Sequence, residues 1–184
     1  MALVVPDAAV GAVGRLIGYV DEPRYATPGS PEAGVEIGFV NSEIATSRAL
    51  ANPTVEEPEL SIWQTGLTLS GTRDTMRLLA ERGQVILTGP LSRLEVEKIT
   101  MLSDSEADLE YCSLDQSINV VSDGSVADQE TIETFHAVDR FVRTADGHWQ
   151  STQNVRIIQD VEGFGDCLDV TVQPAQPQES PATS

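Results

Sequence analysis

The sequence has very little positive charge. Lysine and arginine together number 11 against 29 acidic residues, which gives a formal net charge of -18, and Lys98 is the single lysine. Nucleic acids and anionic lipid surfaces are both bound through clustered cations, which this composition does not supply. We therefore predict no nucleic-acid partner, and we interpret the acidity as a source of solubility.

Long apolar runs are also lacking. The most apolar segment, residues 1–20, is interrupted by Pro6, Asp7, Arg15 and three glycines, a pattern typical of neither a signal peptide nor a membrane span. Apolar residues recur there with helical spacing, so we expect residues 1–30 to form an N-terminal arm or docking helix and a linker. Residues 173–184 are rich in Pro, Gln, Ser and Thr, which predicts a disordered tail.

Groups that commonly carry chemistry are scarce. The two histidines, His136 and His148, are distant from each other in the sequence and cannot supply a zinc set. No glycine-rich phosphate loop follows an expected strand, and no Gly-x-Ser-x-Gly motif occurs. The sequence therefore predicts no metal site and no cofactor.

Cysteine is limited to Cys112 and Cys167. A single distant pair, with no histidine or third cysteine beside either, fits one disulfide better than a metal or redox motif. Closing a loop of this length stabilises a domain by roughly 4 kcal/mol in the chain-entropy model. The alternative is two unpaired buried cysteines. A disulfide implies an oxidising compartment, so we expect an extracellular or cell-envelope location, although no signal peptide is visible.

The first half of the chain is expected to be helical. Ser30 and Pro31 are typical of a helix start, and Asn52-Pro53 of its end. Thr54 and Glu57 have the spacing of a capping box. The expected apolar stripe of the first helix holds Ala33, Ile37, Val40, Ile44, Ser47 and Ala51. A short helix with Leu60, Trp63 and Leu67 on one face should end at Gly66, and a third helix is expected from about Thr68 to Arg82, ending at Gly83.

After Gly83 the hydrophobic period changes to two, which indicates strands. Consecutive strands joined by tight turns predict an antiparallel meander, and helices gathered on one face give an α+β fold with a curved antiparallel sheet. The expected strands are residues 84–88, 94–102, 107–114, about 131–144 and 148–158.

Six short motifs follow one another along the chain: Trp63–Leu67, Glu81–Gly83, Thr88–Pro90, Tyr111–Asp115, Asp146–Trp149 and Gly165–Cys167. Their order resembles that of actinobacterial envelope proteins with the nuclear transport factor 2-like fold. The resemblance covers residues from about 33 to 168 and implies a domain over residues 31–172, a helix-covered cone, and frequent homodimers. A much shorter likeness, over residues 1–7, is to small bacteriophage virion proteins.

Enzymes of the family that the chain resembles perform acid-base chemistry in the cone. The catalytic candidates here are His136, Asp139 and Tyr111, with Asp115 as a further acid. His136 and Asp139 are three apart on an expected strand, so they should face opposite sides of the sheet and not form a dyad. We expect His148 to be solvated, Trp149 to be a core residue, and Asp115 to lie at a strand end.

The sequence thus predicts a non-catalytic binding or scaffolding domain that holds a protein partner or a small apolar ligand. Its alternatives are a virion structural protein that assembles through its N-terminal arm, and a cone-pocket isomerase, dehydratase or cyclase. The expected lining residues are Trp63, Met76, Tyr111 and Phe141.

Overall fold

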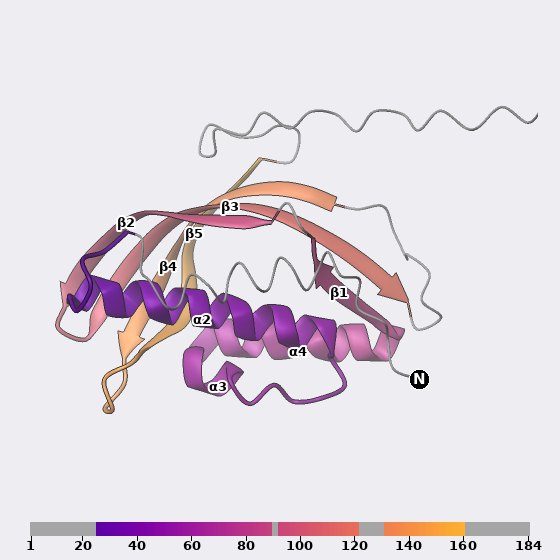
Figure 1. The fold of residues 1–184 in the computed structure, drawn as a ribbon. Helices are drawn as coiled ribbons and strands as arrows, with labels where there is room; N and C mark the ends of the chain where they lie inside the picture. Colours follow the sequence, from indigo (N-terminus) through magenta and orange to yellow (C-terminus); the bar gives the residue numbers. More distant parts are fainter. Residues whose placement is uncertain (1–24, 90–91, 122–130, 161–184) are drawn as a thin grey trace, which may run out of the picture.

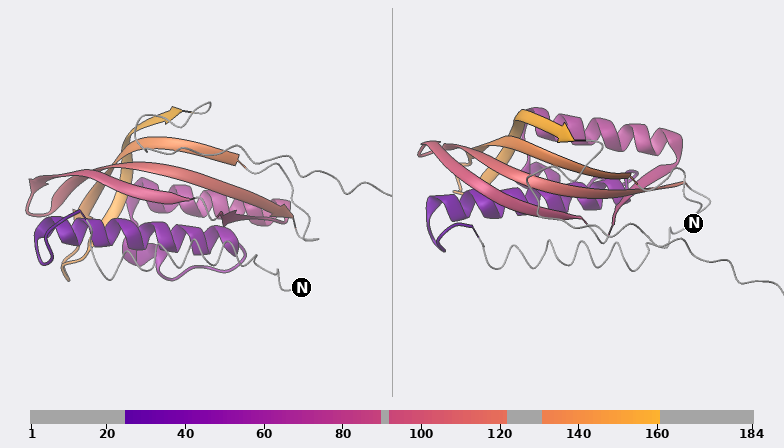
Figure 2. Two further views of the ribbon diagram at one scale, coloured as in Figure 1. Left: turned by 45° about the horizontal axis from the view of Figure 1, so that its top comes forward. Right: turned by 90° about the horizontal axis from the view of Figure 1, so that it is seen from above.

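A curved antiparallel sheet arches over the helices in the computed structural model, which describes residues 25–89, 92–121 and 131–160 (Figure 1). Two further views show the helices gathered on the concave side of the sheet (Figure 2). The predicted α+β class is confirmed. The elements are α2 (Pro31–Ala51), α3 (Leu60–Trp63), α4 (Gly66–Arg82), β1 (Gln84–Thr88), β2 (Arg93–Ser103), β3 (Glu106–Val121), β4 (Thr131–Arg143) and β5 (Trp149–Asp160).

Helix α2 begins and ends where its capping residues predict. The Ser30 side chain accepts a hydrogen bond of 3.2 Å from the Ala33 backbone N–H, and Asn52 caps the other end. The buried surface of α2 is wider than the apolar stripe predicted from the sequence, because Val35, Phe39 and other residues outside that stripe are also buried. The helix contacts the sheet on one side and α3 and α4 on another, so it buries more than one face.

The connection between the first two helices differs from the prediction. Thr54 caps no helix, and α3 begins after Glu59 without a side-chain cap. Gly66, with φ of 54°, starts α4 and does not end α3. Leu67 is 70% exposed and so contributes to no apolar face. The end of α4 at Gly83, with φ of 62°, is as predicted, because glycine adopts this left-handed conformation without steric cost.

Strand β3 is the centre of the sheet and is longer than the sequence predicted. Strands β2, β3, β4 and β5 follow one another as an antiparallel meander, as expected. Strand β1 departs from this order, because it pairs with residues 117–121 of β3 while β2 pairs with residues 106–114. The two strands therefore occupy the same edge of β3, one after the other.

Trp149 anchors the helix to the sheet, as the sequence predicted for a core residue. Its side chain is 2% exposed and packs in a cluster with Phe39, Phe141 and other apolar residues. A Cβ atom at Gly38 would lie 2.5 Å from the Trp149 carbonyl oxygen, so the close approach of α2 to β5 requires glycine there.

Several predictions concern residues outside the described part of the chain. They are the helix in residues 1–20, most of the arm, the tail at residues 173–184, and Cys167. Tyr25 and Ala26 are described, and their backbone N–H groups donate to the Glu36 carboxylate. Within the described residues, no helix is both long and apolar enough to cross a membrane.

Candidate functional site

A cavity of about 310 Å³ lies between α2 and the sheet. Its wall mixes apolar side chains with hydroxyl, carboxyl and amide groups, the composition of a site that positions a small molecule through a few hydrogen bonds. The lining residues come from α2, β1, β3, β5 and the β2 region: Glu43, Thr46, Ser47, Leu50, Ile86, Thr88, Ser92, Leu94, Tyr111, Ser113, Leu114, Asp115, Ser117 and Asn154.

The alternation of β3 supplies much of this wall. Tyr111, Ser113, Asp115 and Ser117 are two residues apart, so they share one face of the strand. The predicted strand ended at Leu114, which left Asp115 as a strand-end residue. The observed β3 continues to Val121, and this places Asp115 in the cavity wall.

Three carboxyl groups belong to the site. Glu43 and Asp115 line the cavity, and Asp139 is buried behind Asn154, whose side-chain amide donates a hydrogen bond to it. Burial raises the pKa of Asp139 to about 6, and the bond from Asn154 opposes that rise. Burial also raises the pKa of Asp115, against a 2.9 Å hydrogen bond from the Ser117 hydroxyl.

Glu43 is the most perturbed of these acids. Burial is the main cause that raises its pKa from 4.5 to about 8, and the charges of Asp139 and Asp115 add to the effect. At neutral pH the site therefore holds Glu43 as a carboxylic acid and Asp139 mainly as a carboxylate. A proton donor and a proton acceptor occur together, which general acid-base chemistry requires.

Tyr111 adds a phenol to the wall. Burial raises its pKa above the ordinary value, with Asp139 and Glu43 adding to the rise, so the hydroxyl stays protonated and can donate a hydrogen bond. The ring packs on Phe39, with centroids 4.6 Å apart. This contact fixes the ring and so sets the direction of the hydroxyl.

The structure brings together part of the predicted catalytic set. Tyr111 lines the cavity and Asp139 lies next to it, whereas His136 lies on the opposite, convex face of the sheet beside Glu97 and Glu110. The separation of His136 from Asp139 follows from the alternation of β4, as expected.

The expected apolar lining residues are distributed differently. Among these four residues, Tyr111 is the one in the wall of the described cavity. Phe141 packs with Trp149 and Met76 with Leu60, both in apolar clusters. Trp63 is partly buried, packs against the cluster that holds Met76, and lies edge-on to His148, with ring centroids 5.4 Å apart.

His148 is less solvated than expected. Its side chain is 28% exposed, Nε2 lies 3.1 Å from the Ile62 carbonyl oxygen, and Nδ1 lies 3.2 Å from the Asp146 carboxylate. These contacts hold the β4–β5 hairpin against α3. The contact with α3 could not be predicted from the position of His148 beside a turn.

Glu43 and Asn154 were not among the predicted site residues. A signal for Glu43 was present, because an acidic residue one position before Ile44, and three after Val40, falls on the side of the helix that was expected to be buried. No such signal exists for Asn154, because its role depends on the pairing of β5 with β4, in which Asn154 lies opposite Asp139.

The chain matches no protein-family model, and no curated protein sequence is significantly similar to it. Among solved structures, it is similar to the intermembrane space region of the chloroplast protein ARC6, with a TM-score of 0.54 and 16% sequence identity. The match covers 68% of this chain and 95% of that chain. At this level of identity the likeness shows the fold alone.

Proposed function

We propose that this domain binds a small amphiphilic molecule, uncharged or cationic, in the cavity between α2 and the sheet. The observation that carries the proposal is the cavity itself, whose wall combines Leu50, Ile86 and Leu94 with carboxyl, hydroxyl and amide groups. The apolar side chains offer burial, and the polar groups fix orientation.

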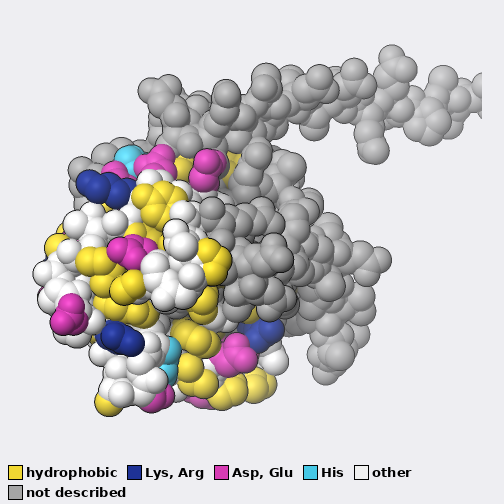
Figure 3. All heavy atoms as spheres, turned by 60° about the vertical axis from the view of Figure 1, so that its left-hand side comes forward, with side chains coloured by type: hydrophobic (Ala, Val, Ile, Leu, Met, Phe, Trp, Pro, Cys, Tyr) yellow, Lys and Arg dark blue, Asp and Glu magenta, His cyan; other side chains and the backbone are white. Residues whose placement is uncertain are grey.

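The charge of the wall and of the surface selects against anions. Glu43 and Asp115 line the cavity, Asp139 lies behind Asn154, and the lining residues in the described part of the chain include no arginine or lysine. The end of the molecule that carries the β2–β3 and β4–β5 hairpins, away from the part of α2 that lines the cavity, shows acidic and basic side chains among apolar ones (Figure 3). A ligand that is neutral or positive meets no repulsion on approach.

We also propose that the chain belongs to the nuclear transport factor 2-like family and is located at the cell envelope or outside the cell. The order of the motifs supports the family, and the single pair of cysteines supports an oxidising compartment. The proposed binding in the cavity depends neither on the family nor on the location.

Cavity filling tests the binding proposal. A library of uncharged, monocationic and anionic amphiphilic fragments is screened against the wild type by saturation-transfer NMR, and the hits are tested against Ser113→Leu, which fills the cavity. Ser103→Leu, an exposed serine on β2, is the matched control. We expect neutral and cationic hits that are lost in Ser113→Leu and kept in Ser103→Leu. Equal binding to both variants, or no hits, contradicts the proposal.

Acid-base catalysis on a small hydrophobic molecule is the second candidate, and the protonated Glu43 beside Asp139 favours it. Elimination of 5-nitrobenzisoxazole reports a general base in an apolar pocket, because abstraction of its ring proton by a carboxylate breaks the N–O bond. We expect a rate above that of the buffer that Asp139→Asn and Glu43→Gln both lower, with no change in Asp74→Asn, an exposed acid on α4. A rate equal in all four proteins excludes this candidate.

A further inference from the structure

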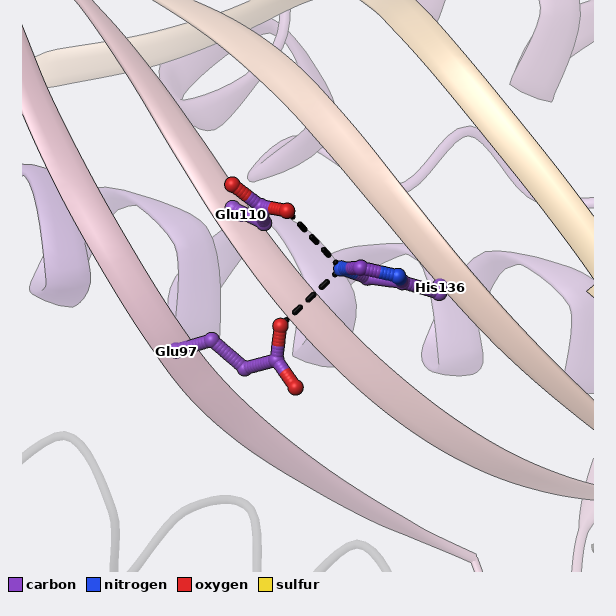
Figure 4. A group of neighbouring side chains, drawn as sticks. All are labelled: Glu97, Glu110 and His136. Carbon is purple, nitrogen blue, oxygen red and sulfur yellow. Dashed lines mark ion pairs between the residues drawn. The ribbon is translucent and has the colours of Figure 1, made fainter. Parts of the chain in front are cut away.

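Three side chains converge on the convex face of the sheet, on the side opposite the cavity. Glu97 of β2, Glu110 of β3 and His136 of β4 come from three adjacent strands (Figure 4). His136 Nε2 lies 2.9 Å from Glu97 Oε2 and 2.9 Å from Glu110 Oε1. A shift in the β2–β3 register between Val96 and Lys98 marks an irregularity at Glu97, which places its side chain beside the other two.

The histidine nitrogen is buried without a hydrogen bond of acceptable geometry within the described residues. It points between the two carboxylates and favours neither, as Figure 4 shows. A buried polar atom in this condition calls for an explanation. Two explanations fit: contacts of the ring with the two carboxylates alone, or a cation held by all three groups.

The distances suit a cation. One donor atom from each residue lies within 4.8 Å of the others. With metal–nitrogen and metal–oxygen bonds of about 2.0–2.2 Å, the right angles of an octahedral site place nitrogen and oxygen about 2.9 Å apart, and tetrahedral angles place them about 3.4 Å apart. One imidazole and two carboxylates suit a first-row divalent transition metal, whereas Mg²⁺ and Ca²⁺ prefer oxygen alone.

We propose that Glu97, Glu110 and His136 form a binding site for one divalent transition-metal ion, with solvent in the remaining coordination positions. The ion joins β2, β3 and β4 on the convex face, and the site is independent of the cavity. Sequence spacing could not reveal it, because the three ligands are brought together by strand pairing.

Titration calorimetry of the full chain with ZnCl₂, without reductant, tests the proposal. We expect saturable binding of one Zn²⁺ per chain and a loss of affinity of more than about tenfold in His136→Gln, since even removal of an outer-shell partner has an effect of that size. His148→Gln is the matched control, because it removes the other histidine, which also lies beside a carboxylate. Glu97→Gln and Glu110→Gln should each weaken binding, and MgCl₂ should give no comparable binding.

A second measurement separates the site from general attraction to an acidic surface. In ¹⁵N-histidine NMR, Zn²⁺ should shift the Nε2 resonance of His136 and leave that of His148 unchanged. Zinc binding that is equal in the wild type and His136→Gln, or that needs His148, overturns the proposal, and so does the absence of stoichiometric binding. Circular dichroism confirms that each variant is folded.

Discussion

Two acidic residues on α2 show how position decides the chemistry of a side chain. Glu36 is fully buried, and its carboxylate accepts hydrogen bonds of 3.0–3.2 Å from the backbone N–H groups of Tyr25 and Ala26. Glu43, two turns further along, faces other acids in the cavity, and its pKa rises to about 8. Glu36 therefore binds the backbone that precedes α2, whereas Glu43 keeps its proton at neutral pH.

Replacement of Glu43 should change how stability depends on pH. The folded protein keeps the Glu43 proton up to about pH 8, whereas the unfolded chain releases it near 4.5. The free energy of unfolding should therefore fall as the pH rises between these values, by on the order of a few kcal/mol. In Glu43→Gln the free energy of unfolding should fall less between about pH 5 and about pH 9 than in the wild type, because the variant has no proton to release at this position. Urea denaturation at the two pH values measures the difference.

Glu81→Gln, which removes an exposed acid on α4, is the control and should keep the pH dependence of the wild type. If Glu43→Gln and the wild type lose stability equally over this range, Glu43 does not hold its proton in the folded state.

At the scale of elements, α2 packs closely on β5 in its first half and lines the cavity in its second half. Gly34 and Gly38 both face Trp149, and they let the helix lie against the start of β5. The cavity opens further along α2, where Glu43, Thr46 and Ser47 lie in its wall. The strand β3 then extends the wall, because its second half pairs with β1.

Two glycine-to-alanine changes should have opposite effects on stability. Gly38→Ala should destabilise the protein by about 2 kcal/mol, because the new Cβ meets the backbone of Trp149. Gly71→Ala should stabilise it by about 1 kcal/mol, since Gly71 lies in α4 with nothing near its Cβ position and alanine favours a helix. Chemical denaturation measures both, and a stabilising Gly38→Ala would contradict the close approach of α2 to β5.

At the scale of the whole molecule, the two faces of the sheet carry different groups of side chains. The concave face carries the core and the cavity, and the convex face carries the cluster of Glu97, Glu110 and His136. Cys112 is paired in register with His136 and is fully buried. Its predicted partner, Cys167, lies outside the described residues, so the disulfide stays a prediction.

Intact mass after alkylation tests the disulfide. The unfolded, non-reduced chain should take up no alkyl groups, and the reduced chain should take up one at each of Cys112 and Cys167. Cys167→Ser should lower the free energy of unfolding by roughly 4 kcal/mol under oxidising conditions. It should match the wild type when both are reduced, and alkylation of the non-reduced wild type would contradict the bridge.

The sequence by itself determined the local structure of the described domain. Ser30 with Pro31, Asn52 with Pro53, and Gly83 set the ends of α2 and α4, because caps and left-handed glycines act within a few residues. The strand periodicity predicted β2, β4 and β5 to within a few residues and placed His136 and Asp139 on opposite faces. The helix start predicted at Thr54 is wrong, because capping-box spacing also occurs in a loop.

Only the tertiary structure decided the sites. Asp115 lies in the cavity wall because pairing with β4 continues β3 past Leu114, with Asp115 opposite Glu133. Asn154 contacts Asp139 through the β4–β5 register, and Glu97 contacts His136 across β3. Each of these contacts joins residues from separate strands, and each depends on a pairing register. The burial that raises the pKa of Glu43 likewise comes from packing α2 on the sheet, which no local pattern of residues encodes.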